Sequence, residues 1–397
     1  MKCRLLYLFL VLLLIHSCSD NLSEIQTRSF VKFYGSYLND ASGDVVSINT
    51  GGYAFTGTMV PDSVAHMVLV RTDEGGNQLT GSPKVYGGAY HTTGIAILEL
   101  DDGFLLGGNF FDTTATNTLQ TDIYIVRTDA EGNELWSKRY GNGENQLLNH
   151  MTTRKGGGFM LAGQKTNAGQ EDIWLLMIDD EGNKEYEFPN SAHEGSGQAE
   201  YLLSVPGGYL CASTYDDGSL AGMDITVTLM DEECSPAGSI VFGTEEDDYA
   251  RALIPFEDGY LVAGYAVSST GYNVVRLYRF DISGGRLTNP SSFATISESG
   301  ADLTCEGMIK NTKGQVAIIG SREVNENRDM MLMLVNSDGT FYSGDDGIPG
   351  LVFGNLGNQT GKAIDNAADG GLIFTGNNSY EGNSLIALVK TTAKGTQ

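Results

Sequence analysis

Short apolar segments bounded by glycine recur along the whole chain. Each begins with Gly or Gln, continues with an aromatic or aliphatic run and ends on a small residue five positions later. The seven copies are GYAFTG at Gly52–Gly57, GFLLGG at Gly103–Gly108, GFMLAG at Gly158–Gly163, GYLCAS at Gly208–Ser213, GYLVAG at Gly259–Gly264, QVAIIG at Gln315–Gly320 and GLIFTG at Gly371–Gly376. Their spacing of 50 to 56 residues indicates a chain of repeated structural units.

Two further patterns accompany most of these segments. In the first, an apolar run ends in Asp or Asn and Gly follows three residues later, where Asp caps a turn and Gly supplies the positive φ. Its copies are Asp73–Gly76, Asp129–Gly132, Asp179–Gly182, Asp281–Gly284 and Asn336–Gly339, with Asp231–Cys234 as a weaker copy. The second pattern is an aromatic residue before Gly, as in Tyr34-Gly35, Tyr86-Gly87, Tyr140-Gly141, Phe242-Gly243 and Phe353-Gly354.

Together the patterns predict four short strands in each unit. The second and third strands are apolar at successive positions instead of alternating, which is typical of a sheet covered on both faces. Four-stranded sheets arranged radially cover one another in this way. The sequence therefore predicts an all-β fold, a seven-bladed β-propeller with four-stranded blades of about fifty residues.

The two ends of the repeat region lack complementary strands. Ser29–Gly35 has the pattern of a fourth strand with no strands before it, and Ser384–Gln397 has that of a third strand with none after it. We expect Phe30–Tyr34 to complete the last blade by pairing with Leu385–Val389, so that the ring closes without a free edge. The predicted propeller spans residues 29–397.

The first residues have the pattern of an export signal. Met1–Arg4 is basic, and Leu5–Ile15 is an apolar run too short to cross a membrane. The segment ending at Cys18 resembles a bacterial lipobox, which implies a signal peptide over residues 1–17, lipidation of Cys18 and a tether over residues 18–28. An ordinary secretion signal or an uncleaved anchor is the alternative. Ser19 resembles an outer-membrane sorting residue.

The repeat is similar to that of the uncharacterised propeller-repeat lipoproteins of Gram-negative bacterial surfaces. The resemblance covers Val31–Gly395 and rests on the glycine-bounded strand, the Asp–Gly turn and the aromatic-Gly pair. Trp136 is the only Trp at the exit of such a turn. The resemblance implies a propeller anchored in the cell envelope. It does not imply a particular activity, because propellers carry many functions.

The net charge of the chain restricts the kinds of partner, and its cysteine spacing bears on disulfide bonds and metal sites. The chain has 24 basic and 50 acidic residues and a net charge of −26, which argues against nucleic acid as a partner. Beyond Cys3 and Cys18, the irregularly spaced Cys211, Cys234 and Cys305 form neither a disulfide framework nor a zinc motif. We expect Cys211 to be a buried thiol, and a Cys211–Cys234 bridge is the alternative.

The loops indicate which face of the propeller carries function. Turns between the first and second strands, and between the third and fourth, are short and alike, whereas the other loops differ between units. We call the side with the differing loops the variable face and expect ligands there. The candidate ligand-binding residues on it are Tyr90, His91, His193, Glu245, Glu246, Asp247, Asp248 and Tyr249.

The candidate chemistry leaves three functions open. Four adjacent acids, Glu245–Asp248, would attract a basic partner or Ca²⁺, or form a solvated loop, and no other cofactor is expected. The favoured function is a non-catalytic propeller, lipid-anchored in the outer membrane, that binds a protein or carbohydrate at the cell surface. A glycan hydrolase or lyase with acids from several blades is the second, and a structural subunit of an envelope complex the third.

Overall fold

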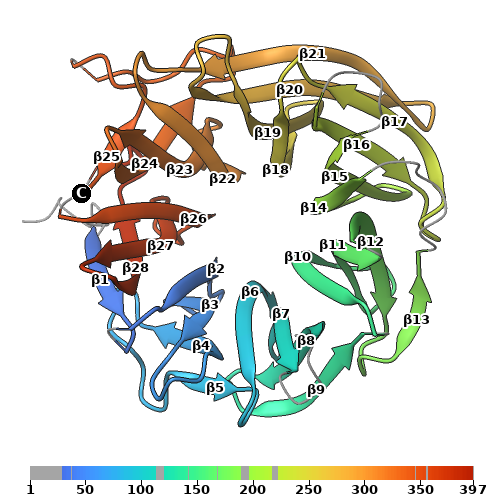
Figure 1. Cartoon of the computed structure of the whole chain (residues 1–397), viewed down its shortest axis with the longest axis vertical. Helices are drawn as coiled ribbons and strands as arrows, with labels where there is room; N and C mark the ends of the chain where they lie inside the picture. The colour runs from blue at the N-terminus through green and yellow to red at the C-terminus, as the bar shows by residue number, and fades with distance from the viewer. Residues whose placement is uncertain are drawn as a thin grey trace, which may run out of the picture.

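The computed structural model contains seven four-stranded antiparallel sheets arranged as a seven-bladed β-propeller around a central channel (Figure 1). The described residues are 29–36, 38–112, 120–141, 143–167, 169–188, 196–216, 222–344, 346–354 and 356–396. They contain no helix, and so none that is long and apolar enough to cross a membrane. The seven-bladed fold predicted from the repeat is confirmed.

Each blade presents its first strand to the channel and its last strand to the outside (Figure 1). The innermost strands are β2 (Ala41–Ser47), β6 (His91–Leu100), β10 (Asn145–Thr153), β14 (Ser196–Val205), β18 (Asp248–Phe256), β22 (Asp302–Lys310) and β26 (Asn358–Asn366). The second strands are β3 (Tyr53–Met59), β7 (Gly103–Asp112), β11 (Phe159–Asn167), β15 (Gly208–Asp216), β19 (Gly259–Val267), β23 (Val316–Val324) and β27 (Leu372–Tyr380).

The outer half of each blade completes the sheet. The third strands are β4 (His66–Thr72), β8 (Gln120–Asp129), β12 (Gln170–Ile178), β16 (Asp224–Met230), β20 (Asn273–Ser283), β24 (Asn327–Val335) and β28 (Asn383–Thr391). The outermost strands are β5 (Lys84–Tyr86), β9 (Glu134–Tyr140), β13 (Lys184–Glu187), β17 (Pro236–Phe242), β21 (Arg286–Ile296), β25 (Leu351–Phe353) and β1 (Phe30–Tyr34).

The core is divided among the interfaces between neighbouring blades. Seven apolar clusters lie in the described residues, and each draws its side chains from two adjacent blades. All seven residues of β3 are buried, because one face packs against the preceding blade and the other against the next. This two-sided burial explains why the second and third strands are apolar at successive positions.

The ring closes through its first strand. β1 pairs antiparallel with β28, so the seventh sheet has the order β1-β28-β27-β26. The register joins Phe30 to Lys390 and Tyr34 to Ile386, so the paired segment is shifted by one residue toward the C-terminus from the expected Leu385–Val389. The two strands, blue and red in Figure 1, lie side by side although nearly the whole chain separates them.

The repeated aromatic-Gly pair and the repeated Asp–Gly turn contact each other across blade interfaces. The hydroxyl of Tyr86 on β5 donates to the carbonyl of Gly132 in the next blade at 2.7 Å. Tyr140 makes the same bond to Gly182 at 2.7 Å. Tyr34 on the closing strand bonds Gly76 in the first blade at 2.5 Å. Three consecutive interfaces are therefore joined by a tyrosine hydroxyl.

The turns that accept these bonds are themselves held by their first residue. The Asp129 carboxylate accepts from the backbone N–H and the side-chain amide of Asn133, and these bonds lower the pKa of Asp129. Lys84 of the preceding blade then donates to the Asn133 side chain at 2.9 Å. Gly132 has φ of 81°, a conformation that a residue with a Cβ adopts at a cost.

Two local expectations have clear outcomes. The Asp281–Gly284 turn differs from the others, because β20 continues to Ser283 and pairs with Arg286 across a two-residue Gly284-Gly285 loop. Both glycines have positive φ, which suits such a hairpin. The second outcome concerns the thiols. The expected burial of Cys211 is confirmed, and Cys211, Cys234 and Cys305 are all free.

The tyrosine contacts predict a measurable loss of stability. Tyr86→Phe should lower the free energy of unfolding by about 1–2 kcal/mol, because the change leaves the buried Gly132 carbonyl without this donor. Tyr380→Phe, at an exposed side chain, is the matched control and should change it by less than about 0.5 kcal/mol. Urea denaturation measures both. Equal effects of the two substitutions would contradict the proposed role of the hydroxyl.

Candidate functional site: the central channel

Every innermost strand contains one β-bulge, where the pairing with its neighbour slips by one or more residues. A bulge leaves a residue without a partner and redirects its side chain. Here the side chains or backbone at the bulges line the channel. The bulged residues are Gly43 with Asp44 in β2, and Ile95, Asn149, Glu200, Arg251, Glu306 and Lys362 in the other innermost strands.

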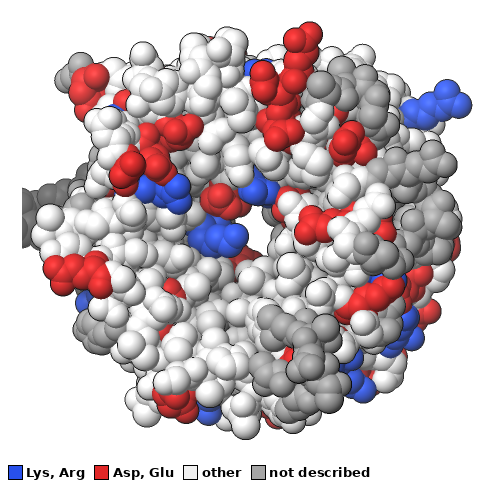
Figure 2. Space-filling view, viewed as in Figure 1, with Lys and Arg blue, Asp and Glu red and all other residues white. Residues whose placement is uncertain are grey.

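The bulges surround a cavity of about 360 Å³ in the channel, and all seven blades contribute to its lining. Five consecutive blades supply charged side chains there. Glu200, Arg251, Glu306 and Lys362 come from four of them, and we call these four the channel ring. The fifth charged residue is Asp44 of the first blade. Figure 2 shows acidic and basic side chains crowded on the β18–β26 side of the opening and mostly uncharged ones on the β2–β6 side. The channel wall is therefore electrically asymmetric.

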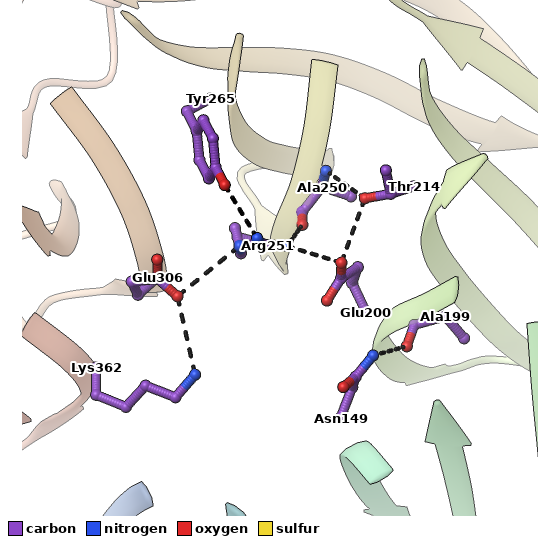
Figure 3. Close-up of polar contacts among 9 residues, drawn as sticks. All are labelled: Asn149, Ala199, Glu200, Thr214, Ala250, Arg251, Tyr265, Glu306 and Lys362. Atoms are coloured by element: carbon purple, nitrogen blue, oxygen red, sulfur yellow. Dashed lines mark hydrogen bonds and ion pairs between the residues drawn. The ribbon is translucent and has the colours of Figure 1, made fainter. Parts of the chain in front are cut away.

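Arg251 is held within the protein by three hydrogen bonds from its terminal nitrogens (Figure 3). Its Nη1 lies 2.7 Å from a Glu200 oxygen and also donates to the backbone carbonyl of Ala250 at 2.9 Å. Its Nη2 donates to the Tyr265 hydroxyl at 3.1 Å. Thr214 donates a further hydrogen bond to Glu200 at 3.3 Å. This half of the ring is a hydrogen-bonded ion pair that links β14 to β18.

Glu306 and Lys362 are much less constrained (Figure 3). A Glu306 oxygen lies 3.8 Å from Arg251 Nε and 3.8 Å from Lys362 Nζ, both too long for a hydrogen bond. Neither side chain makes a hydrogen bond to any other described residue. The side chain of Lys362 is 44% exposed and that of Glu306 is 24% exposed. Both retain hydrogen-bonding capacity toward the channel.

The neighbouring wall presents an imidazole and a phenol. His150 Nδ1 accepts from the backbone N–H of Leu202 at 3.2 Å, so the proton of the neutral ring resides on Nε2. Burial lowers the pKa of His150 to about 3, which keeps the ring neutral at physiological pH. The ring stacks on Tyr201, with 3.8 Å between centroids. Burial raises the pKa of Tyr201, so its hydroxyl stays protonated.

An acid on the first blade also faces this cavity. Asp44 accepts hydrogen bonds from the backbone N–H groups of Val45 at 2.8 Å and Ile97 at 3.3 Å. Burial nevertheless raises its pKa to about 6, and the nearby Asp365 adds to the rise. The carboxyl group therefore gains a proton at mildly acidic pH.

Tyr90, a predicted ligand contact, lies away from the channel. It lines an open hollow with Phe110, Tyr124 and Arg139 between the first two blades. The Tyr90 and Phe110 rings lie 4.8 Å apart, and the Arg139 guanidinium covers the Phe110 ring at 3.7 Å. Tyr90 is 42% exposed, so its role as a ligand contact stays a prediction.

His91 and Asp247 have a hydrogen-bonding role in the fold. His91 Nδ1 accepts from the backbone N–H of Ala65, and Asp247 accepts from that of Met223. Other blades use an Asn or Asp at the equivalent place, four residues before the bulge, to accept the same kind of bond. These are Asn145, Asp302 and Asn358. Ligand binding by His91 and Asp247 remains a prediction.

The acidic loop is less uniform than its sequence indicates. Glu245 and Glu246 are exposed, but Asp248 is completely buried and accepts from both the N–H and the hydroxyl of Thr244. Tyr249 donates to Asp247 at 3.3 Å. Among the described residues no three acids, His or Cys are grouped as a metal site requires, and Ca²⁺ binding here remains untested. Cys18 and His193 lie outside the described residues.

The channel residues were missed because no single stretch of sequence contains them. Their signal is positional: Glu200 and Arg251 lie eight residues before the glycine-bounded segment of their unit, and Glu306 and Lys362 lie nine before it. Aligning the seven units on that segment would have shown a charged residue near the same position of the first strand in four consecutive units.

Comparison with known proteins extends only to the fold. No protein-family model and no curated protein sequence matches this chain. Similar solved structures include Sqt1 from Chaetomium thermophilum, 10% identical over 91% of this chain and 100% of that chain, with a TM-score of 0.48. A protein of unknown function from Bacteroides caccae is 14% identical over 73% and 91%, with a TM-score of 0.41.

An alpha-L-arabinanase from Penicillium chrysogenum, complexed with arabinobiose, is also similar in structure. It is 13% identical over 76% of this chain and 93% of that chain, with a TM-score of 0.44. Similarities at these levels carry no argument about activity or ligand.

The raised pKa of Asp44 predicts a pH-dependent stability. Because the folded state binds this proton more tightly than the unfolded chain, wild type should lose up to about 3 kcal/mol relative to Asp44→Asn as pH rises from about 4 to 6. Asparagine keeps one carbonyl oxygen, which can accept from Val45, whereas its amide nitrogen cannot accept from Ile97, and this loss does not depend on pH. Urea denaturation of both proteins at each pH gives the difference. A difference that does not vary with pH would contradict the assignment.

Proposed function

We propose that this protein is a non-catalytic binding propeller of the cell envelope, anchored by lipid at Cys18, that holds a protein or glycan partner. In this proposal the partner rests on the variable face and part of it enters the channel. The observation that supports it is that Glu306, Lys362, His150 and Tyr201 face one cavity with unused hydrogen-bonding capacity. A binding site needs such convergent polar groups in a preformed hollow.

Electrostatics favours binding over proton transfer. The two acids of the channel ring alternate with its two bases, and Glu200 is held by a hydrogen-bonded Arg251. An acid so engaged is oriented by the protein and poorly placed to deliver a proton to a substrate. The ring supports recognition by fixed donors and acceptors.

A glycan hydrolase is the second candidate, and one feature favours it. Glu200 and Glu306 flank the same guanidinium, so their carboxylates lie within roughly 10 Å, the separation that glycosidases use. Burial raises the pKa of Glu200 even though Arg251 opposes the rise, as a general acid requires. Cleavage of a bound glycan would establish this function in place of the first.

The location is tested through Cys18. Wild type should incorporate a fatty-acid analogue and fractionate with membranes, whereas Cys18→Ala should be unlabelled and released in soluble form. Cys211→Ala is the matched control, because its thiol is buried in the propeller and should leave labelling unchanged. Equal labelling of wild type and Cys18→Ala would refute the lipid anchor.

The binding site is tested with charge-matched pairs on opposite sides of the blades. The double variant Glu306→Gln with Lys362→Met should weaken binding to glycan arrays or to surface proteins captured by cross-linking at least tenfold. Asp101→Asn with Lys313→Met changes the same charges in exposed turns and should leave binding intact. Tyr90→Ala tests whether the variable face also contacts the partner. Loss of binding in the turn variant alone would place the site on the opposite face.

A further inference from the structure

The unused polar groups of the channel form a complementary set of donors and acceptors. Glu306 offers carboxylate oxygens, and Lys362 offers an ammonium group 3.8 Å away. His150 presents an Nε2–H donor, since its Nδ1 already accepts from Leu202. The Tyr201 hydroxyl can donate or accept. A ligand that satisfies them must carry several groups that each donate and accept, as hydroxyl groups do.

Charge balance in the channel restricts the ligand further. Glu200 and Arg251 form a close pair at 2.7 Å, and Glu306 and Lys362 neutralise each other at longer range. The imidazole of His150 is neutral. Asp44 also lines the cavity, and because burial raises its pKa to about 6, it is uncharged at mildly acidic pH and adds a negative charge above that. A charged group entering this site would pair with one member of the Glu306–Lys362 couple and leave the other uncompensated in a partly desolvated channel. The site therefore disfavours carboxylates on the ligand, and it also disfavours ammonium groups when Asp44 is protonated.

Besides the polar side chains, which include Asp44, Asn149 and Gln198, the cavity has an apolar part that suits the C–H face of a sugar ring. Ile95, Ala96, Met308 and Ile364 contribute to its lining, and the stacked His150–Tyr201 pair stands beside them. Sugars combine an apolar ring face with a polar edge, and aromatic side chains bind that face. A volume of about 360 Å³ is at the small end for ligand sites, which fits one or two sugar rings.

We infer that the channel holds an uncharged sugar unit of a glycan, with adjacent hydroxyl groups bridging Glu306 and Lys362. One hydroxyl donates to the Glu306 carboxylate, and its neighbour accepts from the Lys362 ammonium, so the couple separated by 3.8 Å is joined through the ligand. His150 and Tyr201 orient the other edge of the ring. This inference rests on the proposed binding function and specifies its partner as a neutral glycan.

The test uses the mature protein and a panel of methyl glycosides, comprising neutral hexoses and pentoses and the corresponding hexuronic acids and amino sugars. Calorimetric titration at about pH 5, where Asp44 is protonated, should detect at least one neutral glycoside, with the charged counterparts at least tenfold weaker. Glu306→Gln and Lys362→Met, tested singly, should each weaken that binding at least tenfold. Both side chains lack hydrogen bonds in the fold, so thermal melting should confirm that the variants remain folded.

The possible results separate this inference from the function on which it rests. The control Asp101→Asn with Lys313→Met should bind like wild type. Tighter binding of hexuronic acids or amino sugars, or no binding by any glycoside at millimolar concentration, would overturn the neutral-sugar inference. If the neutral-sugar inference fails in this way but a surface protein cross-links to the channel ring, the proposed binding function still stands. If a neutral sugar binds but neither Glu306→Gln nor Lys362→Met weakens that binding, the sugar does not bind between Glu306 and Lys362, and both the inference and the proposed channel site are wrong. Newly formed reducing ends would establish the hydrolase.

Discussion

The dependence of every blade on its neighbours is the constraint that governs this structure. The second and third strands are buried on both faces, and the seven apolar clusters all lie between blades. A blade taken alone would expose two apolar surfaces, so stability requires a closed ring. β1 meets this requirement twice. It completes the seventh sheet by pairing with β28, and its Tyr34 hydroxyl bonds Gly76 of the first blade.

Closure also creates the candidate site. The innermost strands approach one another only because the ring closes, and their bulges then bring one residue from each blade to the same channel. Glu200 and Lys362 are separated by 162 positions in the numbering, yet both belong to one alternating series of charges around Arg251 and Glu306. A site made in this way has no linear motif, because its four charged ring residues come from four different blades.

The sequence was sufficient to predict the fold because the fold depends on features repeated in every unit. Glycine positions, apolar runs and the aromatic-Gly pair set strand number, order and even the pairing of β1 with β28 to within one residue. The candidate site depends instead on how units differ. Variable loops seemed the natural place for it, but His91 and Asp247 occupy positions where other blades also hold a backbone N–H. The residue type at these positions differs between blades, but in each of these blades the side chain accepts a hydrogen bond from a backbone N–H.

The channel ring contains two kinds of charged residue: one pair that is hydrogen-bonded within the fold, and one pair that is free to bind a ligand. Arg251 donates hydrogen bonds to Glu200, Ala250 and Tyr265, so removing its side chain would leave Glu200 buried without its partner. Lys362 and Glu306 contribute little to the fold, since their mutual distance of 3.8 Å is too long for a hydrogen bond and water reaches both. Retaining an acid and a base in a channel costs desolvation without a compensating bond. That cost is offset when a ligand supplies the missing hydrogen bonds, which is why the weak pair, and not the strong one, marks the binding position.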